Sequence, residues 1–221
     1  MRINNCTFPE GLLYDTENFV WININTDKLV TIGITSILAS IAGKLSTIKL
    51  KHTGMKLEKG RSIGTIESIK YFGVVRTPVS CTVAEINDSI INQPKITNDF
   101  PYTQGWLAKL ECSNLTEDLK SLETIENCQN KINSIIEQLR VRCFVAFPDY
   151  EMFEIGLECA ATLTKLDELL TKIAIGEVIH LVSDDPTADL EMIRWSEQTK
   201  QSLLEIRTEA NLFHFIVKKI K

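Results

Sequence analysis

The sequence lacks the short motifs that mark common nucleotide-binding and hydrolytic sites. The patterns GxGxxG, GxxxxGK[ST] and GxSxG do not occur in its 221 residues, and each of these patterns has a defined mechanical role in such sites. Its three histidines, His52, His180 and His214, have no HxxH or cysteine partner at the spacing of zinc ligands. No metal site is therefore predicted.

Long hydrophobic runs and paired cysteines are also missing. No apolar run reaches the roughly 18 residues that a membrane-spanning helix needs, and the start Met1-Arg2-Ile3-Asn4-Asn5 is neither a secretory signal nor an Arg/Ser-rich transit peptide. We therefore expect a cytoplasmic protein without a membrane partner, in the reducing compartment that suits scattered cysteines. The cysteines, none of them in a CxxC pair, are Cys6, Cys81, Cys112, Cys128, Cys143 and Cys159.

The chain also lacks an excess of basic over acidic residues. Residues 1–115 carry 12 Lys/Arg and 10 Asp/Glu, whereas residues 116–221 carry 12 and 19. Because binding to a phosphate backbone needs a clustered basic face, no nucleic-acid partner is predicted. Hydrophobic residues at 44% and charged residues at 24% are typical of a globular protein, and the length allows two small domains.

The first expected domain, residues 1–115, has a β-rich pattern. Short apolar or alternating runs separated by Gly, Pro and Asn are typical of strands, and their spacing predicts a compact barrel or sandwich. One helix is expected at 35–42, where Gly43 can cap the C-terminus. The expected strands are 29–32, 45–50, 63–66, 79–86 and 106–110.

A helical connector is expected at residues 116–149. Apolar residues recur every three or four positions from Leu119 to Leu139, which predicts an amphipathic helix or a broken pair of helices. Fewer than four clean heptads are present, so we favour a helix that packs on its own domain, or bridges two, over a partner-binding coiled coil.

The last part, residues 150–221, alternates in the order β-α-β-α-β-β. This order predicts a two-layer domain with both helices on one face of a mixed sheet, so that the fold class of the whole chain is α+β. The strands are expected at 152–155, 177–182, 202–206 and 212–217, and the helices at 160–173 and 186–200.

The most informative residue is Lys70, in Glu67-Ser68-Ile69-Lys70. β-like runs on both sides predict that it lies at an exposed, rigid turn, where a modifying enzyme can reach its amine. Most of residues 14–110 resembles the glycine cleavage H protein and its relatives, whose lipoyl domain is a barrel-sandwich hybrid. The matching segments are Asn18-Phe19-Val20-Trp21, Thr31-Ile32-Gly33-Ile34-Thr35, Ala42-Gly43, Pro78-Val79-Ser80, Asn92-Gln93-Pro94 and Gly105-Trp106-Leu107.

This resemblance implies a cofactor, partners and site residues. Lipoate would be attached covalently to Lys70, and Glu67 and Ser68 would lie in the surface read by a lipoate ligase or lipoyl transferase. The protein is then more a carrier than an enzyme in its own right, because the chemistry belongs to its cofactor.

The residues after the lysine differ from those of glycine cleavage H proteins. Tyr71-Phe72-Gly73 stands where small residues are usual, and Cys81 stands where a glycine is usual. Lys-aromatic-x-Gly is similar to the lipoate-binding proteins of bacterial and archaeal sulfur oxidation, which work with heterodisulfide-reductase-like complexes. The alternative is that the aromatic pair simply packs at the base of the hairpin.

Residues 150–221 resemble the TusA/SirA sulfur-carrier family, in Gly156-Leu157-Glu158-Cys159 and in Ser183-Asp184-Asp185-Pro186. The resemblance implies a persulfide on Cys159, and amides at a helix N-terminus are expected to lower the pKa of its thiol. The family's Cys-Pro-x-Pro is Cys159-Ala160-Ala161-Thr162 here, and the charge of Glu158 opposes the thiolate. A docking domain with an inert Cys159 is the alternative.

Asp184-Asp185-Pro186 is interpreted structurally, as an N-capping carboxylate followed by proline at the first helical position. Together the two resemblances favour a lipoyl carrier fused to a TusA-like domain, serving sulfur transfer or oxidation with sulfurtransferases or a heterodisulfide-reductase-like complex. The alternatives are a glycine cleavage H protein, carrying aminomethyl groups for glycine decarboxylase components, and a non-catalytic adaptor.

Overall fold

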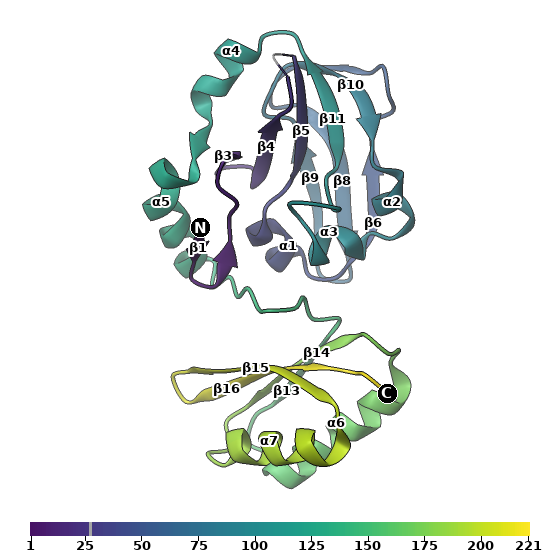
Figure 1. The fold of residues 1–221 in the computed structure, drawn as a ribbon, viewed down its shortest axis with the longest axis vertical. Helices are drawn as coiled ribbons and strands as arrows, with labels where there is room; N and C mark the ends of the chain where they lie inside the picture. Colours follow the sequence, from purple (N-terminus) through teal and green to yellow (C-terminus); the bar gives the residue numbers. More distant parts are fainter. Residues whose placement is uncertain (27) are drawn as a thin grey trace. The chain divides into compact units, whose positions relative to one another are not determined.

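The computed structural model describes residues 1–26 and 28–221, and these form two units, Met1–Cys143 and Phe144–Lys221 (Figure 1). Each unit has its own hydrophobic core. The first unit is β-rich and the second has two long helices on one sheet, so the α+β class is confirmed. Among the described residues, no helix has the length and apolar character needed to cross a bilayer.

The first unit is built on two open antiparallel sheets, not on a closed barrel. The larger has the strand order β12-β3-β4-β5-β11-β10-β7 and the smaller the order β6-β8-β9. The larger contains β12 Glu123–Thr124, β3 Leu13–Asp15, β4 Val20–Ile24, β5 Leu29–Ile34, β11 Ala108–Cys112, β10 Cys81–Ile86 and β7 Lys56–Leu57; the smaller contains β6 Leu45–Leu50, β8 Ser62–Ser68 and β9 Phe72–Arg76.

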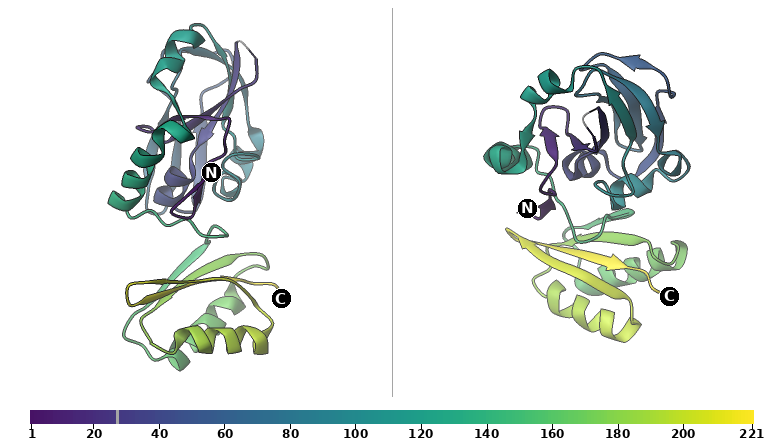
Figure 2. Two further views of the ribbon diagram at one scale, coloured as in Figure 1. Left: turned by 60° about the vertical axis from the view of Figure 1, so that its left-hand side comes forward. Right: turned by 45° about the horizontal axis from the view of Figure 1, so that its top comes forward.

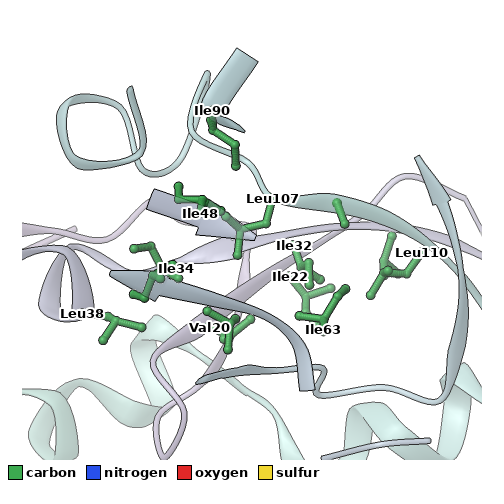
Figure 3. Close-up of a cluster of buried hydrophobic side chains, with 14 of the residues drawn as sticks. Val20, Ile22, Ile32, Ile34, Leu38, Ile48, Ile63, Ile90, Leu107 and Leu110 are labelled. Carbon is green, nitrogen blue, oxygen red and sulfur yellow. The ribbon is translucent and has the colours of Figure 1, made fainter. Parts of the chain in front are cut away.

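The two sheets share one core, because alternate side chains of their strands point to the same interior. Ile22 of β4 and Ile32 of β5 lie beside Ile63 of β8, and all three are fully buried (Figure 3). The short helices add to this core through Leu38 and Ile90 (Figure 3). These helices are α1 Ser36–Ala42, α2 Asp88–Asn92 and α3 Lys95–Asp99.

Residues 115–138 form a broken pair of helices, the second of the two predicted alternatives: α4 Leu115–Asp118 and α5 Ile125–Gln138 are separated by a 3-10 turn at Leu119–Ser121 and by β12. The apolar side of α5 packs on the first unit, together with the N-terminal hairpin of β1 Arg2–Ile3 and β2 Cys6–Thr7. The helix therefore packs on its own unit, as favoured from the sequence. Its buried residues are Ile125, Cys128, Ile132 and Ile136.

The second unit has the predicted order β-α-β-α-β-β. β13 pairs in parallel with β14, and the β15–β16 hairpin continues the sheet in antiparallel fashion, giving the strand order β13-β14-β16-β15. Both helices cover one face of this sheet (Figures 1 and 2). The elements are β13 Tyr150–Glu154, α6 Cys159–Lys172, β14 Val178–Ser183, α7 Ala188–Thr199, β15 Ser202–Glu209 and β16 Leu212–Lys218.

Candidate functional site

Lys70 lies at the tip of the hairpin that joins β8 to β9. Glu67 pairs with Phe72 in the last register of the two strands, and the Ser68 amide donates to the Tyr71 carbonyl at 2.8 Å. This pairing leaves only Ile69 and Lys70 outside the ladder, and both side chains are exposed. The turn predicted from the sequence is therefore present, and it presents the lysine on two paired strands.

The Ser68 hydroxyl fixes this tip to the end of α1. It donates to the Ala42 carbonyl at 2.6 Å, and its oxygen accepts the Lys70 amide at 3.2 Å. Glu67 is exposed on β8 beside it. The structure thus brings Glu67, Ser68 and Lys70 into one hairpin, and it gives Ser68 a structural role that the sequence did not predict.

Gly43 leaves the space in which the lysine stem lies. A Cβ at this position would come within 2.5 Å of Lys70 Cε, closer than any real contact between such atoms. Gly43 also has a φ of 73°, in a region where side chains are strained, and its amide caps α1 by donating to Ala39. Sequence analysis identified Gly43 as a helix cap but not as a neighbour of Lys70.

A buried asparagine holds the Gly43 segment in place. The Asn98 side chain accepts the Leu45 amide at 2.9 Å and donates to the Gly43 carbonyl at 2.9 Å, and it is 4% exposed. Because buried amides are costly to leave unpaired, these bonds fix the chain on both sides of Lys44. Asn98 carried no recognisable sequence signal.

Tyr71 and Phe72 differ in their surroundings. Tyr71 packs against the core, and a Cβ at Gly73 would come within 2.4 Å of its ring, so the glycine makes room for the aromatic residue. Phe72 is 68% exposed. Packing at the base of the hairpin therefore accounts for Tyr71 and Gly73 in Lys-Tyr-x-Gly, whereas it does not account for Phe72.

Cys159 occupies the first turn of α6 in the second unit, as predicted, but its environment disfavours the thiolate. Burial raises the pKa of the Cys159 thiol, and the negative charges of Asp185 and Glu191 raise it further. The Cys159 amide donates to an Asp185 carboxylate oxygen at 2.7 Å. The direction of this pKa shift is therefore opposite to the lowering expected from helix-end amides, because burial raises the pKa and the two carboxylates add to that effect.

Asp184 and Asp185 have structural roles because they bind main-chain amides, but the predicted N-cap is wrong, since the N-cap residue of α7 is Thr187. Asp184 accepts the Gly156 amide at 2.8 Å, and Asp185 also accepts the Thr187 amide at 2.8 Å. The bonds that Asp185 accepts, first from the Thr187 hydroxyl and amide and then from the Cys159 amide, lower the pKa of the Asp185 carboxyl. The predicted helix start at Pro186 is wrong by two residues, since α7 begins at Ala188 after Thr187.

Two further pairs were not predicted from the sequence. A disulfide joins Cys6 to Cys143 in the first unit. In the second unit, His180 Nε2 lies 2.9 Å from His214 Nδ1, and both side chains are buried. Pairing of β14 with β16 brings these histidines together although 34 residues separate them. No cluster of three or more possible metal ligands occurs among residues 1–26 and 28–221.

Comparisons with known proteins identify both parts of the chain. The family model "Glycine cleavage H-protein" matches residues 12–135, more than half of the chain, and the model "Sulfurtransferase TusA" matches residues 154–219. Glycine cleavage system H protein 2 of Aquifex aeolicus is 38% identical over 62% of this chain and 86% of its own length. Probable glycine cleavage system H protein 2 of Sulfolobus acidocaldarius is 39% identical over 63% and 94%.

A solved structure agrees with these matches. The crystal structure of a glycine cleavage system H protein from Mycobacterium marinum superposes with a TM-score of 0.52 at 26% identity, covering 57% of this chain and 98% of that one. Proteins of this family bear lipoate on a lysine. The chain therefore belongs to the glycine cleavage H-protein family and carries a TusA domain after its H-protein domain.

Proposed function

We propose that this protein is a lipoyl carrier whose lipoate is attached to Lys70, and that its arm carries sulfur or sulfur-linked intermediates. The observation that carries the proposal is the hairpin tip, where Lys70 is exposed on two paired strands and its stem lies over Gly43. A ligase or lipoyl transferase needs such a protruding amine on a rigid support. The same proposal places the carrier and its modifying enzyme in the cytoplasm.

The residues present fit this cofactor. The space over Gly43 is one that a Cβ would fill, and the Ser68 hydroxyl holds the turn against α1. Lipoate supplies a cyclic disulfide that is reduced to a dithiol and exchanges with other sulfur groups. The role of the protein chain is to hold the base of the lipoyl-lysine arm in one place while the far end of the arm moves.

The TusA domain in the same chain supports sulfur as the cargo. Tethering two carrier domains raises the effective concentration of one near the other, which is useful only if both handle the same chemistry. Phe72, exposed next to the arm, gives a partner an apolar contact that small residues would not give. We propose sulfurtransferases or a heterodisulfide-reductase-like complex as partners.

Cys159 has a secondary place in this proposal. As a persulfide carrier it needs a thiolate, yet burial and the charge of Asp185 raise the pKa of its thiol. We therefore assign the carrier function to Lys70, and sulfur transfer through Cys159 would require a partner to displace Asp185.

A second candidate function is favoured by one specific observation. The relatives that match residues of the first unit are named glycine cleavage system H proteins, so the arm would carry aminomethyl groups between glycine decarboxylase components. This candidate gives no role to the TusA domain.

One experiment separates the two cargoes. The lipoylated protein is divided into two samples. One is reduced to the dithiol and incubated with a persulfidated sulfurtransferase, and the other keeps its cyclic disulfide and is incubated with glycine decarboxylase and glycine. The mass of the Lys70 peptide is then measured in both. A gain of sulfur with the first mixture alone supports the proposal. A gain of an aminomethyl group with the second mixture alone refutes it and supports the alternative.

A further inference from the structure

The Cys6–Cys143 disulfide joins two distant parts of the first unit. Cys6 lies in β2 and Cys143 is the last residue of the unit, 137 positions later. Their Cα atoms are 5.0 Å apart, within the range that disulfides require. The bond therefore ties the N-terminal hairpin to the end of the segment that follows α5.

The disulfide and the lysine arm contact neighbouring positions of one helix. Ser40 Oγ on α1 lies 3.6 Å from Cys143 Sγ, and the Lys70 stem lies over Gly43, which caps the same helix. Ser40 precedes Gly43 by three positions, which corresponds to a rise of about 4.5 Å along the helix axis. The base of the arm and the disulfide thus lie about one helical turn apart on α1.

The arm is long enough to span this separation. A lysyl side chain extended by the acyl chain of lipoate is longer than two helical turns, about 11 Å. The two cysteine residues differ in exposure, since Cys6 is fully buried and Cys143 is 9% exposed. A dithiol at the end of the arm would therefore meet Cys143 first.

We propose that the Cys6–Cys143 disulfide is an internal redox partner of a dithiol carried on Lys70. This inference rests on the proposed attachment of lipoate to Lys70, and it adds a second redox-active group to the same unit. In the cytoplasm proposed above, protein disulfides are usually transient catalytic or sensing bonds, which agrees with an exchange function.

The exchange balances without a further reagent. The Cys6–Cys143 bond breaks and accepts two electrons and two protons, which leaves a thiol on each cysteine. The dithiol on the arm gives up the same two electrons and protons and closes to a cyclic disulfide. Thiolate attack falls on Cys143, and Cys6 is the leaving sulfur. Exchange would release the N-terminal hairpin from the end of the unit.

The test measures how many NADH molecules the full-length chain consumes, each of which supplies two electrons. Protein with lipoate on Lys70, verified by intact mass, is given NADH and dihydrolipoamide dehydrogenase, which delivers electrons to lipoyl disulfides. We expect the wild type to consume two NADH per chain and a Cys6→Ser/Cys143→Ser double variant to consume one. Peptide mapping after alkylation should show Cys6 and Cys143 newly labelled in the wild type, at a rate that dilution of the protein does not change.

The Lys70→Arg variant is the control, and its disulfide should survive the same treatment. Consumption of one NADH by lipoylated wild type, with Cys6–Cys143 intact in the peptide map, would overturn the inference while leaving the proposed function in place. Equal loss of the disulfide in Lys70→Arg would also overturn it. Absence of a lipoyl adduct on Lys70 would overturn the proposed function and this inference with it.

Discussion

At the scale of residues, the environment of Lys70 depends on side chains that are absent or small. Gly43 provides the space for the lysine stem, and Gly73 provides it for the Tyr71 ring. The sequence identified Lys70, Glu67 and Ser68 through their motif. It could not identify Gly43 as part of the site, because the contact depends on how α1 meets the β8–β9 hairpin and leaves no pattern in either segment.

Gly43→Ala should slow lipoylation severalfold, because the new Cβ would displace the Lys70 stem. Gly43 has a φ of 73° and a ψ of −168°, a region that is essentially restricted to glycine, so a side chain there adds a backbone cost of about 1–3 kcal/mol. Gly54→Ala is a matched control, since Gly54 has a φ of 83° and no atom within 4 Å of its Cβ position. Modification is followed by intact mass against time with a lipoate ligase. Equal rates in the two variants would show that Gly43 matters only for its backbone.

Asp185→Asn should make Cys159 react severalfold faster with iodoacetamide near pH 8. Removing the carboxylate charge lowers the pKa of the thiol from its raised value, so more thiolate is present at that pH. Asp184→Asn is the control, because Asp184 also binds a main-chain amide but is not among the charges that act on Cys159. The opposite order of the two rates would contradict the electrostatic explanation.

At the scale of elements, the spacing of apolar residues along the sequence predicted most of the helices and strands that bury one face. α1, β6 and the six elements of the second unit lie within a few residues of their predicted positions. The strand β9 was missed, because only Val75 is buried in it and Gly73 interrupts the run. The sequence could not decide between a barrel and a sandwich. That difference depends on which distant strands pair with one another, whereas the alternation of apolar and polar residues shows only which face of a strand is buried.

Asn98→Ala should reduce the free energy of unfolding by about 1–3 kcal/mol, because the buried Leu45 amide and Gly43 carbonyl would lose their partner. Urea titration followed by tryptophan fluorescence measures this change. Asn92→Ala serves as the comparison, since Asn92 is exposed and its side chain donates to the Asp88 carbonyl of its own helix. A loss no larger than in Asn92→Ala would contradict the role assigned to Asn98.

At the scale of the whole molecule, composition and periodicity predicted two parts, and the structure has two units with separate cores. The sequence placed residues 116–149 in a connector, whereas residues up to Cys143 lie in the first unit. The Cys6–Cys143 bond could not be predicted, because no spacing rule relates cysteines 137 residues apart.

Limited proteolysis should cut between Cys143 and Tyr150 and leave two resistant fragments. This segment joins the two units and contains no helix or strand before β13, and irregular segments between compact units are preferred sites of cleavage. Mass spectrometry of the fragments locates the cut. A first cut before Cys143 or after Tyr150 would contradict independent folding.

The central claim, that Lys70 bears the lipoyl group, is tested most directly by one mass measurement. The chain is incubated with lipoate, ATP and a lipoate ligase, beside Lys70→Arg and the exposed-lysine control Lys56→Arg. The account predicts one lipoyl adduct in the wild type and in Lys56→Arg, located on the Lys70 peptide, and none in Lys70→Arg. An adduct that persists in Lys70→Arg, or a wild type that stays unmodified, would contradict it.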